Sequence, residues 1–192
     1  MLDIGSGLGG FVEALLTAGA DATGLEPSPA ADQAAAQARP VRRGAFDRLH
    51  LPRDILTRKY DLITFRESLY YIPDLSDTFR LLKDMLKERG NVYIKCHTAE
   101  SAYYARCNNY TSRYGRTVQG MPTLRALRTI LKKEGFVITH WRNIEFRYLS
   151  VFGIPPYSIW EKAAHKLSCA LLHRVPNIRA DRIIVLAKRM TR

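Results

Sequence analysis

The fold of this chain is decided by the stretch Met1-Leu-Asp-Ile-Gly5-Ser-Gly-Leu-Gly-Gly10 and by Gly24-Leu-Glu26, which follows it. The apolar residues before the glycines are typical of a strand and the glycines of a turn, and the apolar residues after them recur at helical spacing. A second apolar strand then ends on Glu26. This order predicts a doubly wound, mostly parallel α/β sheet with a nucleotide-cofactor site of the Rossmann type.

Asp3 indicates which cofactor the glycine turn holds. Gly5, Gly7 and Gly10 also fit the G-x-G-x-x-G fingerprint of NAD-binding domains, but Asp3 lies two positions before Gly5 and brings a carboxylate to the turn. A dinucleotide places its pyrophosphate there, and a neighbouring anion opposes the helix N-terminus that attracts phosphate. S-adenosylmethionine has an ammonium and a sulfonium group instead, which a carboxylate attracts. The sequence therefore predicts S-adenosylmethionine as the cofactor.

Glu26 supports a bound nucleoside without choosing between cofactors. It ends the second strand about twenty residues after the turn, the spacing at which an acid accepts hydrogen bonds from ribose hydroxyls. The alternative is a solvated loop glutamate. For Asp3 the alternative is an acid that caps the amides of the turn, a role that is compatible with cofactor binding.

The glycine turn is the first of a series of motifs that spans residues 2 to 97. After Leu2-Asp-Ile-Gly-Ser-Gly-Leu-Gly9 come Gly24-Leu-Glu-Pro-Ser-Pro29, Tyr60-Asp-Leu-Ile-Thr64, Leu69-Tyr-Tyr-Ile-Pro-Asp74 and Leu86-Lys-Glu-Arg-Gly90. In this order they resemble the class I S-adenosylmethionine-dependent methyltransferases, especially the small-molecule branch that includes the ubiquinone-biosynthesis enzymes. The resemblance implies a Rossmann-like sheet with an antiparallel last strand, and methyl transfer to a small-molecule, sugar or lipid-intermediate acceptor.

The resemblance also implies which residues hold the cofactor. In the family, the loop after the third strand contacts the adenine with an acid and an apolar residue, and here Ala45-Phe46-Asp47 occupies that loop. A core phenylalanine and a surface aspartate are the alternatives. The predicted cofactor-binding residues are Asp3, Gly5, Ser6, Gly7, Gly9, Glu26, Pro27, Phe46, Asp47 and Arg66.

The acceptor side is expected just beyond the fourth strand, where open parallel sheets bind ligands. The stretch Arg66 to Pro73 fills it, with Tyr70-Tyr71 where many look-alikes carry Glu-His. If the acceptor is a hydroxyl, a base would assist, and the candidates are Tyr71, His97 and Glu67. A hydrogen-bonded structural histidine is the alternative for His97. Residues 98–121 and 149–178 are expected to be inserts or acceptor-side segments.

Later elements follow from apolar periodicity and from residues that begin or end helices. A helix is expected over Leu75–Lys87, closed by Gly90, before a fifth strand at Asn91–Cys96. A helix capped by Thr123 and ended by Gly135 precedes a strand at Phe136–Trp141. The last strand, 182–188, is expected to lie antiparallel between the fifth and sixth, as in the family.

Composition limits the other possibilities. The 192 residues, 46% of them hydrophobic, predict one domain over residues 1–192. The chain has no apolar run of membrane-spanning length and no signal-peptide pattern, so a cytoplasmic protein is expected. Cys96, Cys107 and Cys169 are too widely spaced to suggest a disulfide framework or a zinc knuckle, and no metal site is predicted.

Charge is distributed unevenly along the chain. Residues 1–38 contain five acids and no Lys or Arg, whereas residues 101–192 contain seventeen Lys plus Arg and four acids. The basic half suits nucleic acid, an anionic membrane surface or an acidic substrate, and a soluble basic surface is the alternative. Within it, Trp160, Ala163 and Leu167 lie on one apolar helical face, which favours packing on the sheet over lying on a membrane.

Two rival functions remain from the sequence. One is a methyltransferase-like scaffold that has lost catalysis, and the other is methylation of RNA, which only the charge favours. Only four residues, Met1 to Ile4, precede the turn, whereas a central strand usually has about five or six. Family members also carry helices before that strand, so the working enzyme is expected to extend further at its N-terminus.

Overall fold

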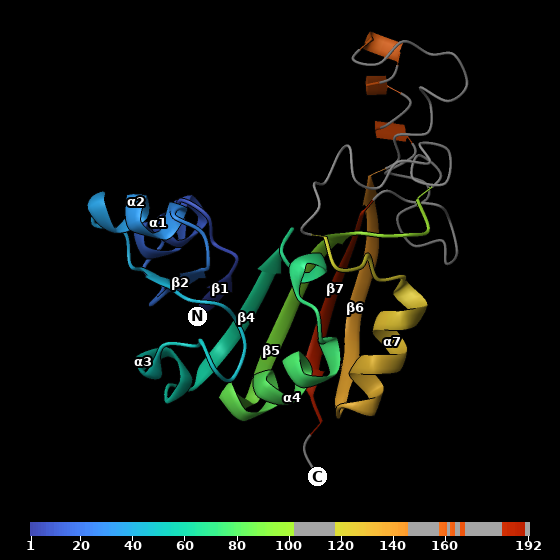
Figure 1. Cartoon of the computed structure of the whole chain (residues 1–192). Helices are drawn as coiled ribbons and strands as arrows, with labels where there is room; N and C mark the ends of the chain where they lie inside the picture. The colour runs from blue at the N-terminus through green and yellow to red at the C-terminus, as the bar shows by residue number, and fades with distance from the viewer. Residues whose placement is uncertain (102–117, 146–157, 161, 164–165, 168–181, 191–192) are drawn as a thin grey trace.

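The computed structural model describes residues 1–101, 118–145, 158–160, 162–163, 166–167 and 182–190. The seven strands among these residues form one sheet in the order β3-β2-β1-β4-β5-β7-β6 (Figure 1). All neighbouring strands are parallel except at β7, which runs antiparallel to both β5 and β6. The predicted fold class is confirmed, including an antiparallel last strand between the fifth and sixth.

The elements of the sheet and its helices alternate along the chain. The strands are β1 (Leu2–Ile4), β2 (Thr23–Glu26), β3 (Val41–Arg43), β4 (Tyr60–Arg66), β5 (Leu86–His97), β6 (Phe136–Glu145) and β7 (Arg182–Arg189). The helices are α1 (Gly10–Thr17), α2 (Ala30–Ala36), α3 (Arg53–Leu56), the 3-10 turn η1 (Leu69–Tyr71), α4 (Leu75–Met85) and α7 (Leu124–Lys133). Neither α3 nor η1 was predicted from the sequence.

Helices α4 and α7 lie over the same face of the sheet (Figure 1). Both begin at a side-chain cap, because the carboxylate of Asp74 accepts from the amide of Asp77 and the hydroxyl of Thr123 accepts from the amide of Ala126. Gly135, with a φ of 84°, follows the last turn of α7 as predicted. Strand β1 and the middle of β4, Ile63 to Phe65, are buried on both faces, as is typical of parallel strands at the centre of a sheet.

The predicted end of α4 at Gly90 is wrong. The helix stops at Met85, and Leu86 is already extended, with φ −79° and ψ 143°. Gly90 lies inside β5, where an added Cβ would come within 2.8 Å of the Leu86 side chain and 3.0 Å of the Tyr60 carbonyl. The glycine therefore permits close packing beside an irregular part of the β4–β5 pairing, rather than ending a helix.

The carboxyl ends of the parallel strands meet at one edge of the sheet. Because β7 is antiparallel, its first residue, Arg182, reaches the same edge and pairs with His97 at the end of β5. Most of the two predicted acceptor-side segments, 98–121 and 149–178, lies outside the described residues, as do Cys107 and Cys169. Within the described residues, no helix is long and apolar enough to cross a membrane.

The expectation that the apolar face with Trp160, Ala163 and Leu167 packs on the sheet is wrong for its described large side chains, and the neighbouring Ile159 is exposed as well. Ile159 is 76% exposed, Trp160 73% and Leu167 61%. In Figure 1 these short orange helical pieces lie beyond the carboxyl edge of the sheet, away from the face that α4 and α7 cover.

Candidate cofactor and active site

The glycine turn carries the chain from β1 to α1 through left-handed backbone. Gly5 has a φ of 74°, and an added Cβ would lie 2.4 Å from the Cβ of Ser68, so only glycine fits there. Gly7, with a φ of 56°, has open space where a Cβ would be, and Gly9 forms the N-cap of α1. The Ser6 hydroxyl is buried and lacks a hydrogen-bond partner among the described residues. The turn thus leaves an uncovered backbone surface in front of a helix N-terminus.

Asp3 lies in the middle of β1 and is only 3% exposed. Its carboxylate accepts a hydrogen bond of 2.5 Å from the Thr64 hydroxyl on β4. Burial raises the pKa of Asp3, and the Thr64 hydrogen bond and the charge of Arg66 oppose that rise only in part. A buried carboxylate that costs free energy to ionise gains most from a cation brought close to it.

Glu26 links the tip of β2 to the glycine turn. One carboxylate oxygen accepts from the amide of Gly7 at 2.9 Å, and the other accepts from the amide of Ser28 at 3.0 Å. The side chain is 8% exposed but borders the cavity described below. Each oxygen has a further lone pair, so the fixed carboxylate can still accept from ribose hydroxyls.

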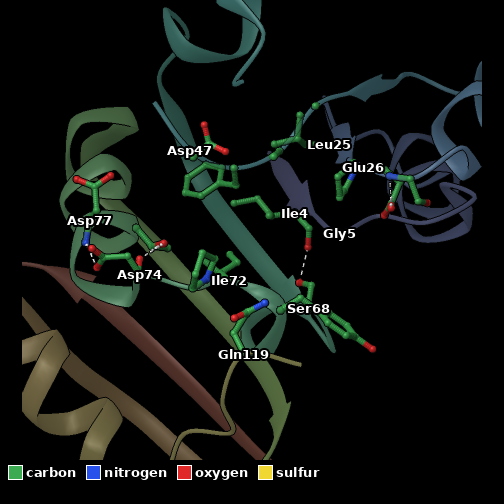
Figure 2. Close-up of a pocket in the computed structure, with 18 of the residues that line it drawn as sticks. Ile4, Gly5, Leu25, Glu26, Asp47, Ser68, Ile72, Asp74, Asp77 and Gln119 are labelled. Atoms are coloured by element: carbon green, nitrogen blue, oxygen red, sulfur yellow. Dashed lines mark hydrogen bonds between the residues drawn. The ribbon is translucent and has the colours of Figure 1, made fainter. Parts of the chain in front are cut away.

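A cavity of about 710 Å³ opens along the carboxyl edge of the sheet, within the range of small-molecule sites. Figure 2 shows Glu26 on one side, and on the other Asp74, which caps α4, and Asp77 in its first turn, with Ile4 and Ile72 between the two sides. Of the predicted site residues, it is lined by Gly5, Glu26, Pro27, Phe46, Asp47, Glu67 and Tyr71. Asp3, Ser6, Gly7, Gly9, Arg66 and His97 do not appear among its described lining residues.

The loop after β3 is shaped by Asp47. One carboxylate oxygen accepts from the amides of Leu49 and His50, and both lie within 3.0 Å of the His50 ring nitrogen Nδ1. Burial alone would raise the pKa of Asp47, but these hydrogen bonds outweigh it and lower the pKa. Phe46 packs edge-on against Phe65, with ring centroids 5.9 Å apart. The core role of Phe46 and its place in the cavity wall are therefore compatible.

The residues after β4 turn sharply toward the cavity. Glu67 has a φ of 61°, a strained value for a residue with a side chain and one that is concentrated at functional sites. Ser68 donates to the Ile4 carbonyl at 2.5 Å, which holds this turn against β1. The guanidinium of Arg66 lies 3.9 Å from the ring centroid of Phe11 on α1, near the glycine turn.

Glu67, His97 and Arg182 form a polar cluster across the ends of β4, β5 and β7. Arg182 Nε lies 3.0 Å from Glu67 Oε1 and donates to His97 Nε2 at 3.1 Å. The cluster therefore places His97 Nε2 between the Arg182 guanidinium and the Glu67 carboxylate, whose Oε2 lies 3.5 Å away. Tyr71 on η1 is 42% exposed.

Comparisons with known proteins agree with this geometry. The sequence model described as "Methyltransferase domain" matches residues 1–141. The chain belongs to the methyltransferase-domain family. It is a class I S-adenosylmethionine-dependent methyltransferase, which confirms the predicted enzyme class and cofactor. No curated protein matches the chain by sequence.

Solved structures of this methyltransferase fold resemble the chain over its whole length. An S-adenosylmethionine-dependent methyltransferase from Mesorhizobium loti has a TM-score of 0.67 at 21% identity, over 98% of this chain and 89% of that one. One from Archaeoglobus fulgidus has a TM-score of 0.70 at 16% identity, over 98% and 85%. A possible histamine N-methyltransferase from Thermotoga maritima has a TM-score of 0.67 at 14% identity, over 99% and 81%. Identities this low show a shared fold.

The residues of the methyltransferase fit its cofactor. The open backbone at Gly7 and the carboxylate of Glu26 are arranged for a nucleoside with a short chain, and no Lys or Arg among the described lining residues calls for a phosphate. The described residues contain no group of three His, Cys, Asp or Glu that could hold a metal ion.

Sequence reasoning missed Arg182, Ser68 and Gln119, of which the last two line the cavity. Arg182 had a signal, because an antiparallel last strand beginning at residue 182 must start at the carboxyl edge. Ser68 and Gln119 lie within the stretches 66–73 and 98–121 that were expected on the acceptor side, but nothing singled them out there, since their places depend on how η1 and the residues before α7 pack. The amide of Gln119 donates to the Tyr70 carbonyl at 2.9 Å.

Proposed function

We propose that this methyltransferase acts on a small molecule that binds in the cavity between Glu26 and Tyr71, with Glu67 as the residue that accepts a proton from the acceptor. The observation that carries the proposal is the continuity of one cavity from the glycine turn and Glu26 to the strained turn at Glu67. Bound S-adenosylmethionine supplies an electrophilic methyl group on a sulfonium. The chain's contribution is to hold donor and acceptor in alignment and to take up a proton.

Binding of the cofactor is assigned to the first half of the site. Glu26 and the amides of the turn would hold the nucleoside, and Pro27 and Phe46 would bound it on the β2 and β3 sides. Asp3 would favour the positive methionine end by its charge rather than by direct exposure, since it is buried against Thr64. Arg66, near Phe11 and the turn, has the charge to balance the methionine carboxylate.

Glu67 is favoured as the proton acceptor over the other two candidates. Its carboxylate forms an ion pair with Arg182 at 3.0 Å, and each of its oxygens has a further lone pair that could accept a proton. His97 accepts from Arg182 through Nε2, so that lone pair is already engaged, and His97 is not a described lining residue. Tyr71 lines the cavity but would first have to lose its own proton.

The charge of the cavity favours a neutral or cationic small molecule over RNA. Its described lining contains no Lys, Arg or His, and its five carboxylates belong to Glu26, Asp47, Glu67, Asp74 and Asp77. Carboxylates in a cleft repel the phosphates of a polyanion, even though the whole chain has a formal net charge of +12.

The test is a screen for methyl transfer. Purified protein is incubated with S-adenosylmethionine that carries a deuterated methyl group and with fractions of a metabolite extract, and products are sought by mass spectrometry. A labelled small molecule that disappears with Glu67→Gln is expected. Labelling confined to RNA, or labelled product formed equally by Glu67→Gln, would contradict the proposal.

A further inference from the structure

The segment 159–167 carries an exposed apolar arc. The amide of Lys162 donates to the Ser158 carbonyl at 3.1 Å, the spacing of an α-helical turn. On the helical periodicity of the sequence, about 100° per residue, Ile159, Trp160 and Leu167 fall within one arc of about 100°. They are 76%, 73% and 61% exposed, although large apolar side chains on one helical face normally pack against a core.

Two lysines border this arc. On the same helical geometry Lys162 and Lys166 lie on one flank of the apolar residues, and both are exposed. The surrounding sequence is also positively charged, since residues 101–192 contain seventeen Lys plus Arg and four acids. Exposed apolar residues with a tryptophan beside lysines are the composition of a helix that lies in a membrane interface.

We propose that the segment 159–167 docks this methyltransferase on an anionic lipid surface. Ile159, Trp160 and Leu167 enter the boundary between headgroups and acyl chains, while Lys162 and Lys166 contact the anionic headgroups through their flexible stems. The described parts of the segment lie beyond the carboxyl edge of the sheet (Figure 1), the edge whose residues line the cavity. Docking there places the site near the lipid surface.

Two other occupants fit these residues less well. A second copy of the chain on this face would bring the lysines of the two copies together, and like charges oppose that contact. A nucleic acid would use the lysines and the tryptophan but leaves Ile159 and Leu167 without a role. Charge and apolar exposure together therefore favour lipid.

The test measures binding to vesicles and needs neither cofactor nor acceptor, so it stands apart from the proposed function. Full-length protein is floated with vesicles of phosphatidylcholine alone or mixed with phosphatidylglycerol, at low and high salt. The chain has two tryptophans, so a Trp141→Phe background leaves Trp160 as the fluorescent reporter. Binding to the mixed vesicles, weakened by salt, with a blue shift of Trp160 emission, is expected.

Matched variants separate this segment from general basic charge. Lys162→Gln with Lys166→Gln should weaken vesicle binding about 30-fold, a factor of about five for each lysine. Lys132→Gln with Lys133→Gln, the same charge change on exposed residues of α7, should weaken it much less. Ile159→Ser with Leu167→Ser should abolish binding, whereas Leu49→Ser, at a side chain that is 88% exposed, should not.

Several results would overturn the proposal. These are no binding to mixed vesicles, equal binding to phosphatidylcholine alone, or equal losses in the two lysine pairs. Self-association in sedimentation that Ile159→Ser with Leu167→Ser removes, without vesicle binding, would assign the face to a second copy. RNA binding that needs Lys162 and Lys166, without vesicle binding, would assign it to nucleic acid. Unchanged thermal unfolding of each variant shows that it is folded.

Discussion

Replacing Asp3 by Asn should stabilise the protein without cofactor and weaken its binding of S-adenosylmethionine. Asp3 is 3% exposed and its pKa is raised chiefly by burial, so its ionised form costs free energy in the folded state. Asparagine keeps an oxygen for the Thr64 hydroxyl and removes the charge. A stabilisation of about 0.5–2 kcal/mol is expected at neutral pH, as for other substitutions that relieve a strained active site. For a chain of this size each kcal/mol raises Tm by about 2–4 °C.

The pH dependence of this gain has a definite sign. The pKa of Asp3 in the folded protein lies above its ordinary value of 3.8, so the folded state holds this proton more tightly than the unfolded chain does. The free energy of unfolding therefore falls as the pH rises from 3.8 through the folded pKa, where the folded state loses the proton. The advantage of Asp3→Asn should therefore be complete above the folded pKa and vanish below 3.8. Loss of a charged partner should weaken cofactor binding by about 1.5–3 kcal/mol, or roughly 10- to 150-fold.

Thermal unfolding between acid and neutral pH, with and without cofactor, measures both effects. Asp61→Asn is the control, because Asp61 is exposed and its pKa is lowered by Lys87. That variant should leave cofactor affinity unchanged. If Asp3→Asn lowered Tm at neutral pH, or bound S-adenosylmethionine as tightly as wild type, the account of the buried carboxylate would be refuted.

Three further substitutions test the turn, the ribose carboxylate and the proton acceptor. Gly5→Ala should destabilise the fold by about 1–3 kcal/mol or more through its φ of 74° and the contact with Ser68, and an unchanged Tm would contradict this. Glu26→Ala should weaken cofactor binding by about 1–3 kcal/mol in calorimetry, and an equal affinity would exclude the ribose role. Glu67→Gln should lower kcat about 100-fold or more with cofactor affinity kept, and loss of affinity instead would move Glu67 to the cofactor site.

The parts of the fold that sequence predicted best are those fixed by local chemistry. The positive φ values of the turn need glycine, and Thr123 and Gly135 begin and end α7 as their side chains and backbone favour. Glu26 was predicted from its place at a strand tip, and it does reach the turn through the Gly7 amide. The glycine and capping signals survive folding because they act within a few residues.

The parts that sequence could not predict depend on contacts between distant segments. Gly90 follows an amphipathic segment, as a glycine that ends a helix would. In the structure Leu86 pairs with Tyr60 of β4, so the chain is already in β5 when it reaches Gly90. The contact between His97 and Arg182 could not be predicted from the sequence. Arg182 lies 85 residues away, and only the register of β7 against β5 brings it beside His97. The apolar arc of Ile159, Trp160 and Leu167 has the periodicity of a core helix, and only the structure shows it exposed.

The measurement that tests the central claim most directly is a calorimetric titration of the protein with S-adenosylmethionine, S-adenosylhomocysteine and NAD. The claim is that the cavity between the glycine turn and Glu67 binds the methyl donor through Glu26 and Asp3. One molecule of S-adenosylmethionine and one of S-adenosylhomocysteine should bind per chain, both weakened by Glu26→Ala, and NAD should not bind. Tight binding of NAD, with no heat from S-adenosylmethionine, would contradict it.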